Sequence, residues 1–265
     1  MNLLFGNRGN HKIIGFLIFL ILICSCDETI LDIDLSEFER NIVIEAVISD
    51  RTGPYTVKIS RIENFFEEEV TLLVTGAEIN VYDDEGNTET LTEVNAGMYR
   101  GSKIRGVPGR RYKLEVQYKG EEYIAYSTMP EPMTLKSIVT EKVESNNYKL
   151  LFFISDILDV DEYCKLKIFR NGQFQRDILY YDKLSEGDEV VIDETGFTRF
   201  DQVEIELVTF TKEIFEYFSS LKELEDSDDS ELLELTGGNP KSNISNNALG
   251  YFSAQTYRKY TKIIQ

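Results

Sequence analysis

The chain has 265 residues, with 47 acidic and 28 basic side chains, so its formal net charge at pH 7 is −19. This charge argues against nucleic-acid binding, because affinity for nucleic acid depends on neutralising phosphates with Lys and Arg. The one histidine is His11, inside the export signal described next. Its position excludes Ser-His-Asp triads, Cys-His pairs and histidine zinc sites from the rest of the chain.

The N-terminus has the pattern of an export signal. Arg8 and Lys12 precede an unbroken apolar run from Ile13 to Ile23, and the first acidic residue is Asp27. A helix over this run would rise about 16 Å, roughly half the hydrocarbon thickness of a bilayer, so the run is too short to span a membrane. A buried core helix is the alternative, but such a helix rarely follows a basic flank at the extreme N-terminus. Residues 1–25 are therefore predicted to be a signal peptide.

The end of the apolar run resembles a lipobox, the motif that lipoprotein signal peptidases read. Ile23-Cys24-Ser25-Cys26 has a branched apolar residue three positions before Cys26 and a small residue just before it. Cys26 is the predicted lipidation site, because a thiolate is a strong nucleophile that forms a stable thioether. Two or more acyl chains anchor a protein stably where one does not. The sequence predicts attachment to a membrane through this lipid, followed by an acidic tether over residues 26–40.

Regular β patterning begins after the tether. Apolar and polar residues alternate with period two over residues 55–60, 77–81 and 112–118, and turn-forming residues follow the second of these runs. This pattern predicts an antiparallel β-sandwich over residues 41–130. Pro130-Glu131-Pro132 interrupts the pattern and marks the predicted domain boundary.

A second β block follows the prolines, over residues 133–265. Strand patterns cover residues 148–155, 163–170, 173–181 and 202–210, and Asn171-Gly172 is a strong β-hairpin sequence. A final strand is expected around residues 254–264. The predicted fold class is mainly β, with two antiparallel β-sandwich domains of Ig-like or transthyretin-like type.

One segment has helical rather than strand periodicity. Over residues 211–225, apolar side chains recur at the spacing of a helix face, at Ile214, Phe215, Phe218, Leu221 and Leu224. The sequence predicts a helical insertion there, which either covers the end of a sandwich or binds a partner; the covering role is favoured. The acidic run over residues 223–231 is predicted to be a solvated loop.

The stretch over residues 236–253 is rich in turn-forming residues and ends in two aromatic side chains. Such a loop needs side-chain hydrogen bonds to hold one shape. Functional residues favour loops on rigid scaffolds, so this loop and the nearby helix are the predicted binding surface. Its candidate residues are Asn239, Asn243, Asn246, Tyr251 and Phe252. A loop locked by its own hydrogen bonds is the favoured alternative.

No motif of phosphate binding, nucleophilic catalysis or zinc binding occurs in the chain, so no catalytic residue, metal ligand or cofactor is predicted. Asp83, Glu85 and Asn87 alternate as in a calcium loop, but Thr88 stands where that loop needs glycine. Cys164 alternates with apolar residues of a strand and is predicted to be a small buried hydrophobe. A carboxylate pair, as in glycosidases, is the remaining catalytic option.

Several segments together resemble a known family. They are the lipobox with its acidic tether, Gly53–Arg61, Val74–Asp84, Gly97-Met98-Tyr99, and Gly238–Asn243 continuing to Gly250–Ser253. In this order they resemble Bacteroidota lipoproteins known only as a domain of unknown function, often encoded beside TonB-dependent outer-membrane receptors. The resemblance implies a place in the cell envelope and a role in assisting a receptor, with no known activity. In lipoproteins of this kind, acidic residues after the lipidated cysteine, here Asp27 and Glu28, accompany display on the outer face of the outer membrane.

The sequence thus favours a non-enzymatic lipoprotein of the outer membrane that acts as a binding or accessory module, with a TonB-dependent receptor as the implied partner. Two alternatives remain open. One is a structural or adhesive surface protein, and the other is a carboxylate-dependent hydrolase.

Overall fold

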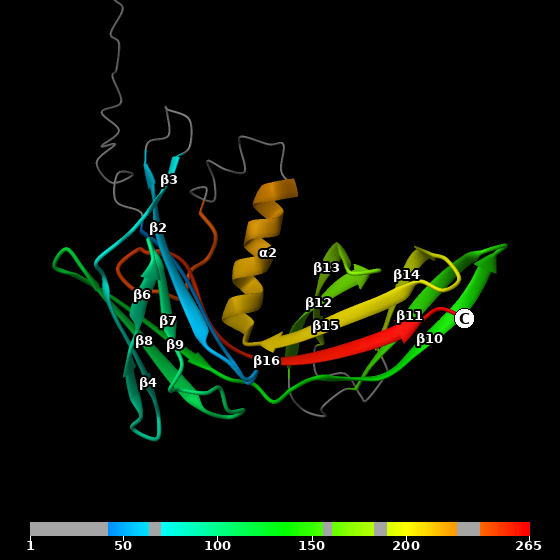
Figure 1. The fold of residues 1–265 in the computed structure, drawn as a ribbon, viewed down its shortest axis with the longest axis horizontal. Helices are drawn as coiled ribbons and strands as arrows, with labels where there is room; N and C mark the ends of the chain where they lie inside the picture. The colour runs from blue at the N-terminus through cyan, green and yellow to red at the C-terminus, as the bar shows by residue number, and fades with distance from the viewer. Residues whose placement is uncertain (1–41, 64–69, 156–160, 183–189, 227–238) are drawn as a thin grey trace, which may run out of the picture. The chain divides into compact units, whose positions relative to one another are not determined.

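The computed structural model describes residues 42–63, 70–155, 161–182, 190–226 and 239–265 (Figure 1). The predicted signal peptide (1–25), Cys26 and the tether (26–40) lie outside these residues, as does most of the acidic run 223–231. Among the described residues, no helix is long and apolar enough to cross a bilayer.

The first half of the described chain consists of short and medium strands. They are β1 (Ile42–Ser49), β2 (Tyr55–Glu63), β3 (Val70–Leu73), β4 (Glu78–Asp83), β5 (Thr88–Thr90), β6 (Thr92–Asn95), β7 (Met98–Gly101), β8 (Arg111–Tyr118) and β9 (Glu121–Thr128). The alternating runs in the sequence became β2, β4 and β8, because a half-buried strand needs an apolar side chain at every second position.

The second half contains longer strands and the one helix among the described residues. These elements are β10 (Thr134–Glu144), β11 (Asn147–Ser155), β12 (Glu162–Arg170), β13 (Gln173–Asp182), β14 (Val190–Phe197), β15 (Gln202–Phe210), α2 (Lys212–Asp226) and β16 (Leu249–Ile263). The predicted Asn171-Gly172 hairpin joins β12 to β13, and both turn residues have positive φ. The predicted helix at 211–225 is observed at 212–226. The described residues form a mainly β fold with one helix, which confirms the predicted fold class.

The strands of the described residues form three sheets. The largest has nine strands in the order β13-β12-β15-β16-β1-β2-β7-β6, with β3 pairing with β2 beside this path. The other two have the orders β5-β4-β8-β9 and β10-β11-β14. The large sheet supplies one layer of both sandwiches, since each smaller sheet shares a buried apolar cluster with a different part of it.

Two apolar cores fill the space between the sheets. The first contains alternate residues of β1, such as Ile44 and Ile48, together with Ile79 of β4 and Leu114 of β8. The second contains Leu166 of β12 and Ile205 of β15 together with Phe152 of β11 and other buried side chains. Burial of these side chains is the main stabilising contribution to such a fold.

Strand β16 pairs with both halves of the chain. It runs parallel to β1, with Val43 opposite Leu249, and antiparallel to β15, with Lys262 opposite Val203 (Figure 1). Strand pairing therefore continues past the predicted boundary at residues 130–132, and the division into domains at 41–130 and 133–265 stays a prediction.

Strand β16 begins at Leu249, five residues earlier than the sequence predicts. The reason is Gly250, whose φ is +93° and whose missing side chain lets the backbone of β1 approach. A Cβ at this position would lie 2.1 Å from the Ile44 carbonyl oxygen. Tyr251 and Phe252 therefore belong to a strand and not, as predicted, to the end of a loop.

Helix α2 packs on the face of the large sheet that is turned away from the cores. Ile214 is fully buried against Val208 and Phe210 of β15, whose neighbours Val203, Ile205 and Leu207 point the other way into the second core. The helix thus covers a sheet face and not the end of a sandwich, because alternation along β15 leaves apolar side chains on both of its faces.

Candidate functional site

The turn between β14 and β15 presents an aromatic side chain to solvent in a strained backbone conformation. Phe200 has φ +71°, in the left-handed region that bulky residues avoid. Its side chain is 73% exposed, the highest value among the exposed large apolar residues of the described chain. Strained residues persist only where surrounding structure fixes them, and they concentrate at functional sites. This turn is therefore the candidate functional site.

A buried carboxylate fixes the turn. Asp201 is 6% exposed and accepts hydrogen bonds from the Thr198 N–H at 2.7 Å and the Asn171 amide at 2.8 Å. The Arg170 guanidinium forms an ion pair with it at 2.7 Å and also donates to the Gly196 carbonyl at 3.0 Å. Burial by itself raises the pKa of Asp201, but these hydrogen bonds outweigh burial and lower the pKa to about 2.

Backbone bonds tie Phe200 to the end of the last strand. The Phe200 N–H donates to the Ile264 carbonyl at 2.8 Å, and the Ile264 N–H donates to the Asp201 carbonyl at 3.0 Å. The neighbouring Ile263 is 56% exposed, and the guanidinium of Arg199 lies 5.0 Å from the centre of the Phe200 ring. We call Arg199, Phe200 and Ile263 the Phe200 tip. It combines an aromatic, an aliphatic and a cationic side chain on a rigid support.

The Phe200 tip lies at the opposite end of β16 from the start of β1. Strand β16 begins with Leu249 opposite Val43 of β1. Strand β16 then runs for 15 residues to Ile263, a length of roughly 50 Å at about 3.3 Å per residue. The tip and the start of β1 thus lie at opposite ends of β16.

The predicted binding residue Asn243 is engaged within the fold. Its amide donates to the Phe252 carbonyl at 2.8 Å, and its side-chain oxygen accepts from the Phe252 N–H at 2.9 Å. Asn243 thus caps the backbone of β16 in the way that a neighbouring strand would. This arrangement is the loop held by its own hydrogen bonds, which the sequence left as the alternative.

The rest of the loop covers an edge strand. Ile244 forms a β-bridge with Ala125 of β9, and Ser245 exchanges hydrogen bonds with Ile124. The Asn246 amide donates to Glu121 at 3.0 Å, at the start of the same strand. An uncovered edge strand can pair with other chains. This part of the loop therefore protects the edge of β9.

The loop and the helix lie together, as the sequence predicted. The Lys241 N–H donates to the Ser220 hydroxyl at 3.1 Å, and the ring of Tyr251 packs 4.8 Å from that of Tyr217. Burial raises the pKa of Tyr251 to about 12. Phe252 is 0% exposed and points into the first core, whereas Asn239 is exposed. The candidate residues are thus near one another but do not share one accessible surface.

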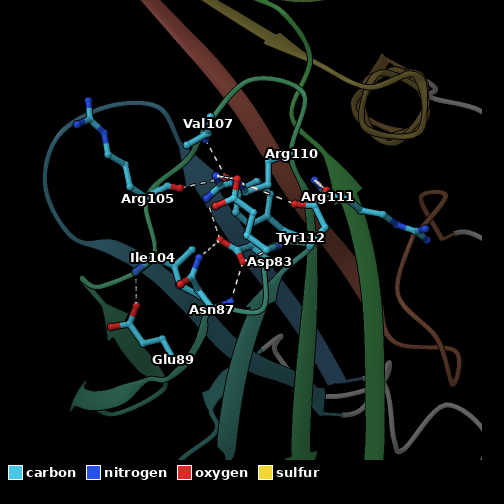
Figure 2. Close-up of polar contacts among 11 residues, drawn as sticks. Asp83, Asn87, Glu89, Ile104, Arg105, Val107, Arg110, Arg111 and Tyr112 are labelled. Carbon is cyan, nitrogen blue, oxygen red and sulfur yellow. Dashed lines mark hydrogen bonds and ion pairs between the residues drawn. The ribbon is translucent and has the colours of Figure 1, made fainter.

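The turn that resembles a calcium loop is filled by protein donors (Figure 2). Asp83 accepts from the N–H groups of Glu85 and Asn87 and forms an ion pair with Arg110 at 2.9 Å. Burial raises the pKa of Asp83, but the bonds from Asn87 and the charge of Arg110 lower it overall. Among the described residues, no three His, Cys, Asp or Glu side chains are grouped to hold a metal ion.

A second buried carboxylate is equally committed to structure. Glu89 accepts from the N–H groups of Ser102, Lys103 and Ile104 at 2.7–2.9 Å and from the Tyr55 hydroxyl at 2.9 Å. Burial and the Glu89 charge raise the pKa of Tyr55. This carboxylate therefore holds the chain after β7 against β2 and is not placed to transfer a proton to a ligand.

The thiol of Cys164 is fully buried in the second core, as the sequence predicted. Burial raises its pKa, so the unreactive thiol form is favoured. Cys26 lies outside the described residues, and its lipidation stays a prediction.

Periodicity in the sequence does not indicate the Phe200 tip, because a single turn residue belongs to no repeating pattern. The available indication is the segment Thr198-Arg199-Phe200-Asp201, in which an aromatic residue stands inside a polar turn between two strands. Thr and Asp at the ends of a turn are typical of side-chain to backbone hydrogen bonds.

A family model described as "Domain of unknown function (DUF4249)" matches residues 28–261. The search of the curated proteins finds no match. Among solved structures, the chain is similar to the FN1–FN3 domains of chicken CNTN1, with 10% identity and a TM-score of 0.30 over 84% of this chain and 66% of that one. It therefore spans just under two thirds of the length of that structure.

Two further structures show comparable similarity. One is a segment of two fibronectin type-III domains from chicken tenascin, with 8% identity, a TM-score of 0.22 and coverage of 64% and 91% of the two chains. The other is a putative carbohydrate binding protein from Bacteroides uniformis, with 11% identity, a TM-score of 0.25 and coverage of 85% and 98%. Similarity at this level assigns no activity or ligand.

Proposed function

This chain belongs to the DUF4249 family of domains of unknown function, and from that premise we propose that it is a non-enzymatic binding module of the outer membrane. In this proposal a lipid on Cys26 anchors the chain, and the Phe200 tip binds a protein partner. The resemblance to lipoproteins encoded beside TonB-dependent receptors makes such a receptor the proposed partner.

The observation that carries the proposal is the strained and exposed Phe200. A non-glycine residue in the left-handed conformation costs about 1–2 kcal/mol, and an exposed phenyl ring recovers little of this by burial within the chain. The turn nevertheless holds Phe200 in place through Asp201 and Ile264. Binding of a partner supplies the burial that the free protein lacks, since aromatic and arginine side chains dominate protein interfaces.

The sequence supports the location. A basic flank, an apolar run and the lipobox at Cys26 precede an acidic tether, and acylation of this kind anchors a protein stably. The net charge of −19 keeps the body of the protein away from anionic surfaces, so the lipid is the proposed membrane contact. The acidic residues after Cys26 favour display on the outer face of the outer membrane.

The chemistry of the buried acids supports a binding role over a catalytic one. Asp83, Glu89 and Asp201 each accept hydrogen bonds from backbone N–H groups and hold turns or strands together. The pKa of each is lowered, whereas a general acid needs a raised pKa. These three buried carboxylates thus serve the fold.

The test is capture of partners with a Phe200→Asn variant of the full lipoprotein. Asn tolerates the left-handed conformation, so this variant keeps the turn while removing the ring. Affinity purification from solubilised outer membranes, followed by mass spectrometry, should recover an outer-membrane receptor with the unchanged protein and several-fold less with the variant. The free energy of unfolding should stay equal or rise by about 0.5–1 kcal/mol, because strain is relieved.

The control is Leu73→Ser, which removes another exposed apolar side chain (48%) from β3. It should capture the receptor as well as the unchanged protein does. Undiminished capture by Phe200→Asn would overturn the proposed site. Capture of no envelope protein by any variant would overturn the accessory role and favour the structural or adhesive alternative.

A further inference from the structure

Strand β13 forms an edge of the nine-stranded sheet, with β12 as its neighbour. It is 10 residues long, and long edge strands present backbone groups that can pair with another chain. The other edges are blunted in different ways. Strands β5 and β6 have 3 and 4 residues, Ile244 covers β9, and two register shifts interrupt β10. The edge strand β14 is contacted by two side chains of the large sheet, Arg170 at Gly196 and Arg176 at Glu194.

Two exposed aromatic side chains stand at the two ends of β13 on one face of the sheet. Phe174 is 56% exposed and packs edge-on against Phe169 at 5.7 Å; Tyr181 is 46% exposed and stacks with Tyr163 at 6.3 Å. A β-bulge opposite Ile168 and Phe169 inserts Gln175 as an extra residue. Without this insertion, Phe174 and Tyr181 would point to opposite faces, because side chains alternate along a strand.

We propose that β13 pairs antiparallel with β13 of a second copy of this chain. In a two-fold pairing through Ile178, that residue lies opposite itself and Tyr181 lies opposite Phe174 of the second copy. Because Gln175 is the extra residue of the bulge, Phe174 and Tyr181 are equally many paired positions away from Ile178. They also lie on the same face of the sheet, as residues opposite each other must. Both exposed aromatic side chains of the edge then become cross-strand partners, once on each side of the axis.

Self-complementarity is the reason for a second copy and not an unrelated strand. A two-fold interface requires that one surface matches itself, and the symmetric spacing of Phe174 and Tyr181 about Ile178 meets this requirement. Local charge does not oppose the contact, although the chain as a whole is strongly acidic. Near the axis, Arg176 forms an ion pair with Glu194, and Asp177 forms one with Lys165 at 3.5 Å, so each charge is already balanced within its own chain. The proposal is independent of the Phe200 tip.

The test is a disulfide across the axis. In the membrane-anchored protein, Ile178→Cys places two thiols opposite each other, with Cα atoms about 4.5–5.5 Å apart, within the range of disulfides. Oxidation with copper phenanthroline should give a band of twice the monomer mass on a non-reducing gel. Light scattering of the unchanged lipoprotein in detergent should give the mass of a dimer, which tests the proposal without any substitution.

Three controls separate the dimer from random collision. The unchanged protein, with Cys26 and buried Cys164, should give no band, and neither should Val143→Cys, whose position is 53% exposed but outside β13. Adding Phe174→Glu to Ile178→Cys removes the aromatic pair on both sides of the axis and should weaken dimerisation about tenfold. A monomer mass in light scattering, an equal band from Val143→Cys, or cross-links from Ile178→Cys only to a protein of different mass would overturn the proposal.

Discussion

The carboxylate of Asp201 shows how a single residue shapes the candidate site. It is buried, and it accepts hydrogen bonds from the Thr198 N–H and from Asn171 while Arg170 provides the opposite charge. Asn171 in turn accepts a hydrogen bond from the Gln202 N–H at 2.9 Å. The turn that carries Phe200 and the hairpin between β12 and β13 are thus fixed by one acid.

This acid makes stability depend on pH in a defined direction. Its pKa is about 2 in the folded protein and about 3.9 in an unfolded chain. A lowered pKa means that the stabilisation is complete above about pH 4 and is lost as the pH falls toward 2. We expect Asp201→Asn to lower the free energy of unfolding at pH 7 by about 2 kcal/mol. We also expect the variant to lose less stability than the unchanged protein between pH 5 and pH 2.

Urea denaturation at a series of pH values checks this expectation. Glu141→Gln is the control, because Glu141 is an exposed acid on β10, and it should change the free energy of unfolding by no more than about 0.5 kcal/mol. If Asp201→Asn left both the stability at pH 7 and its acid dependence unchanged, the described role of this carboxylate would be wrong.

At the scale of elements, the loop before β16 acts as a cover for strand edges. Asn243 replaces a strand partner for Phe252, and Ile244 and Ser245 pair with the edge of β9. We expect Asn243→Ala to lower the free energy of unfolding by about 1–3 kcal/mol, because it leaves a backbone N–H and a carbonyl of β16 without their partner.

Asn239→Ala is the matched control for this substitution. Asn239 is exposed at the beginning of the same loop, so its loss should leave stability within about 0.5 kcal/mol of the unchanged protein. Thermal and urea denaturation of both variants measure the difference. Equal stabilities for the two would mean that the bonds from Asn243 contribute nothing, and a binding role for its amide would regain support.

At the scale of the whole molecule, the proposed function requires a lipid anchor at one end of the chain. We expect wild-type protein to carry acyl chains on Cys26 and to sediment with outer membranes, whereas Cys26→Ser should lose the acyl mass and leave the outer-membrane fraction. Mass spectrometry of the N-terminal peptide and membrane fractionation provide the two measurements.

Cys24→Ala is the control, because the lipobox places the modified thiol at Cys26. This variant should remain acylated and anchored. Acylation that persists in Cys26→Ser, or that disappears in Cys24→Ala, would assign the modified cysteine to the other position.

The sequence by itself determined the features that depend on neighbours along the chain. Alternation with period two located β2, β4, β8, β12 and β15, Asn171-Gly172 located a hairpin, and helical spacing located α2 to within one residue. Composition removed histidine chemistry from residues 12–265, and strand alternation predicted the burial of Cys164. These features follow from the geometry of single strands, turns and helices.

Tertiary structure decided the features that depend on residues far apart in the chain. Only the pairing of β16 with β1 places Tyr251 and Phe252 in a strand, and only the contact of Asn243 with Phe252 assigns that amide to the fold. The exposure of Phe200 likewise depends on Arg170, Asp201 and Ile264. No local pattern encodes such contacts, because the partner of a strand edge or buried carboxylate is fixed by which distant segments meet when the cores form.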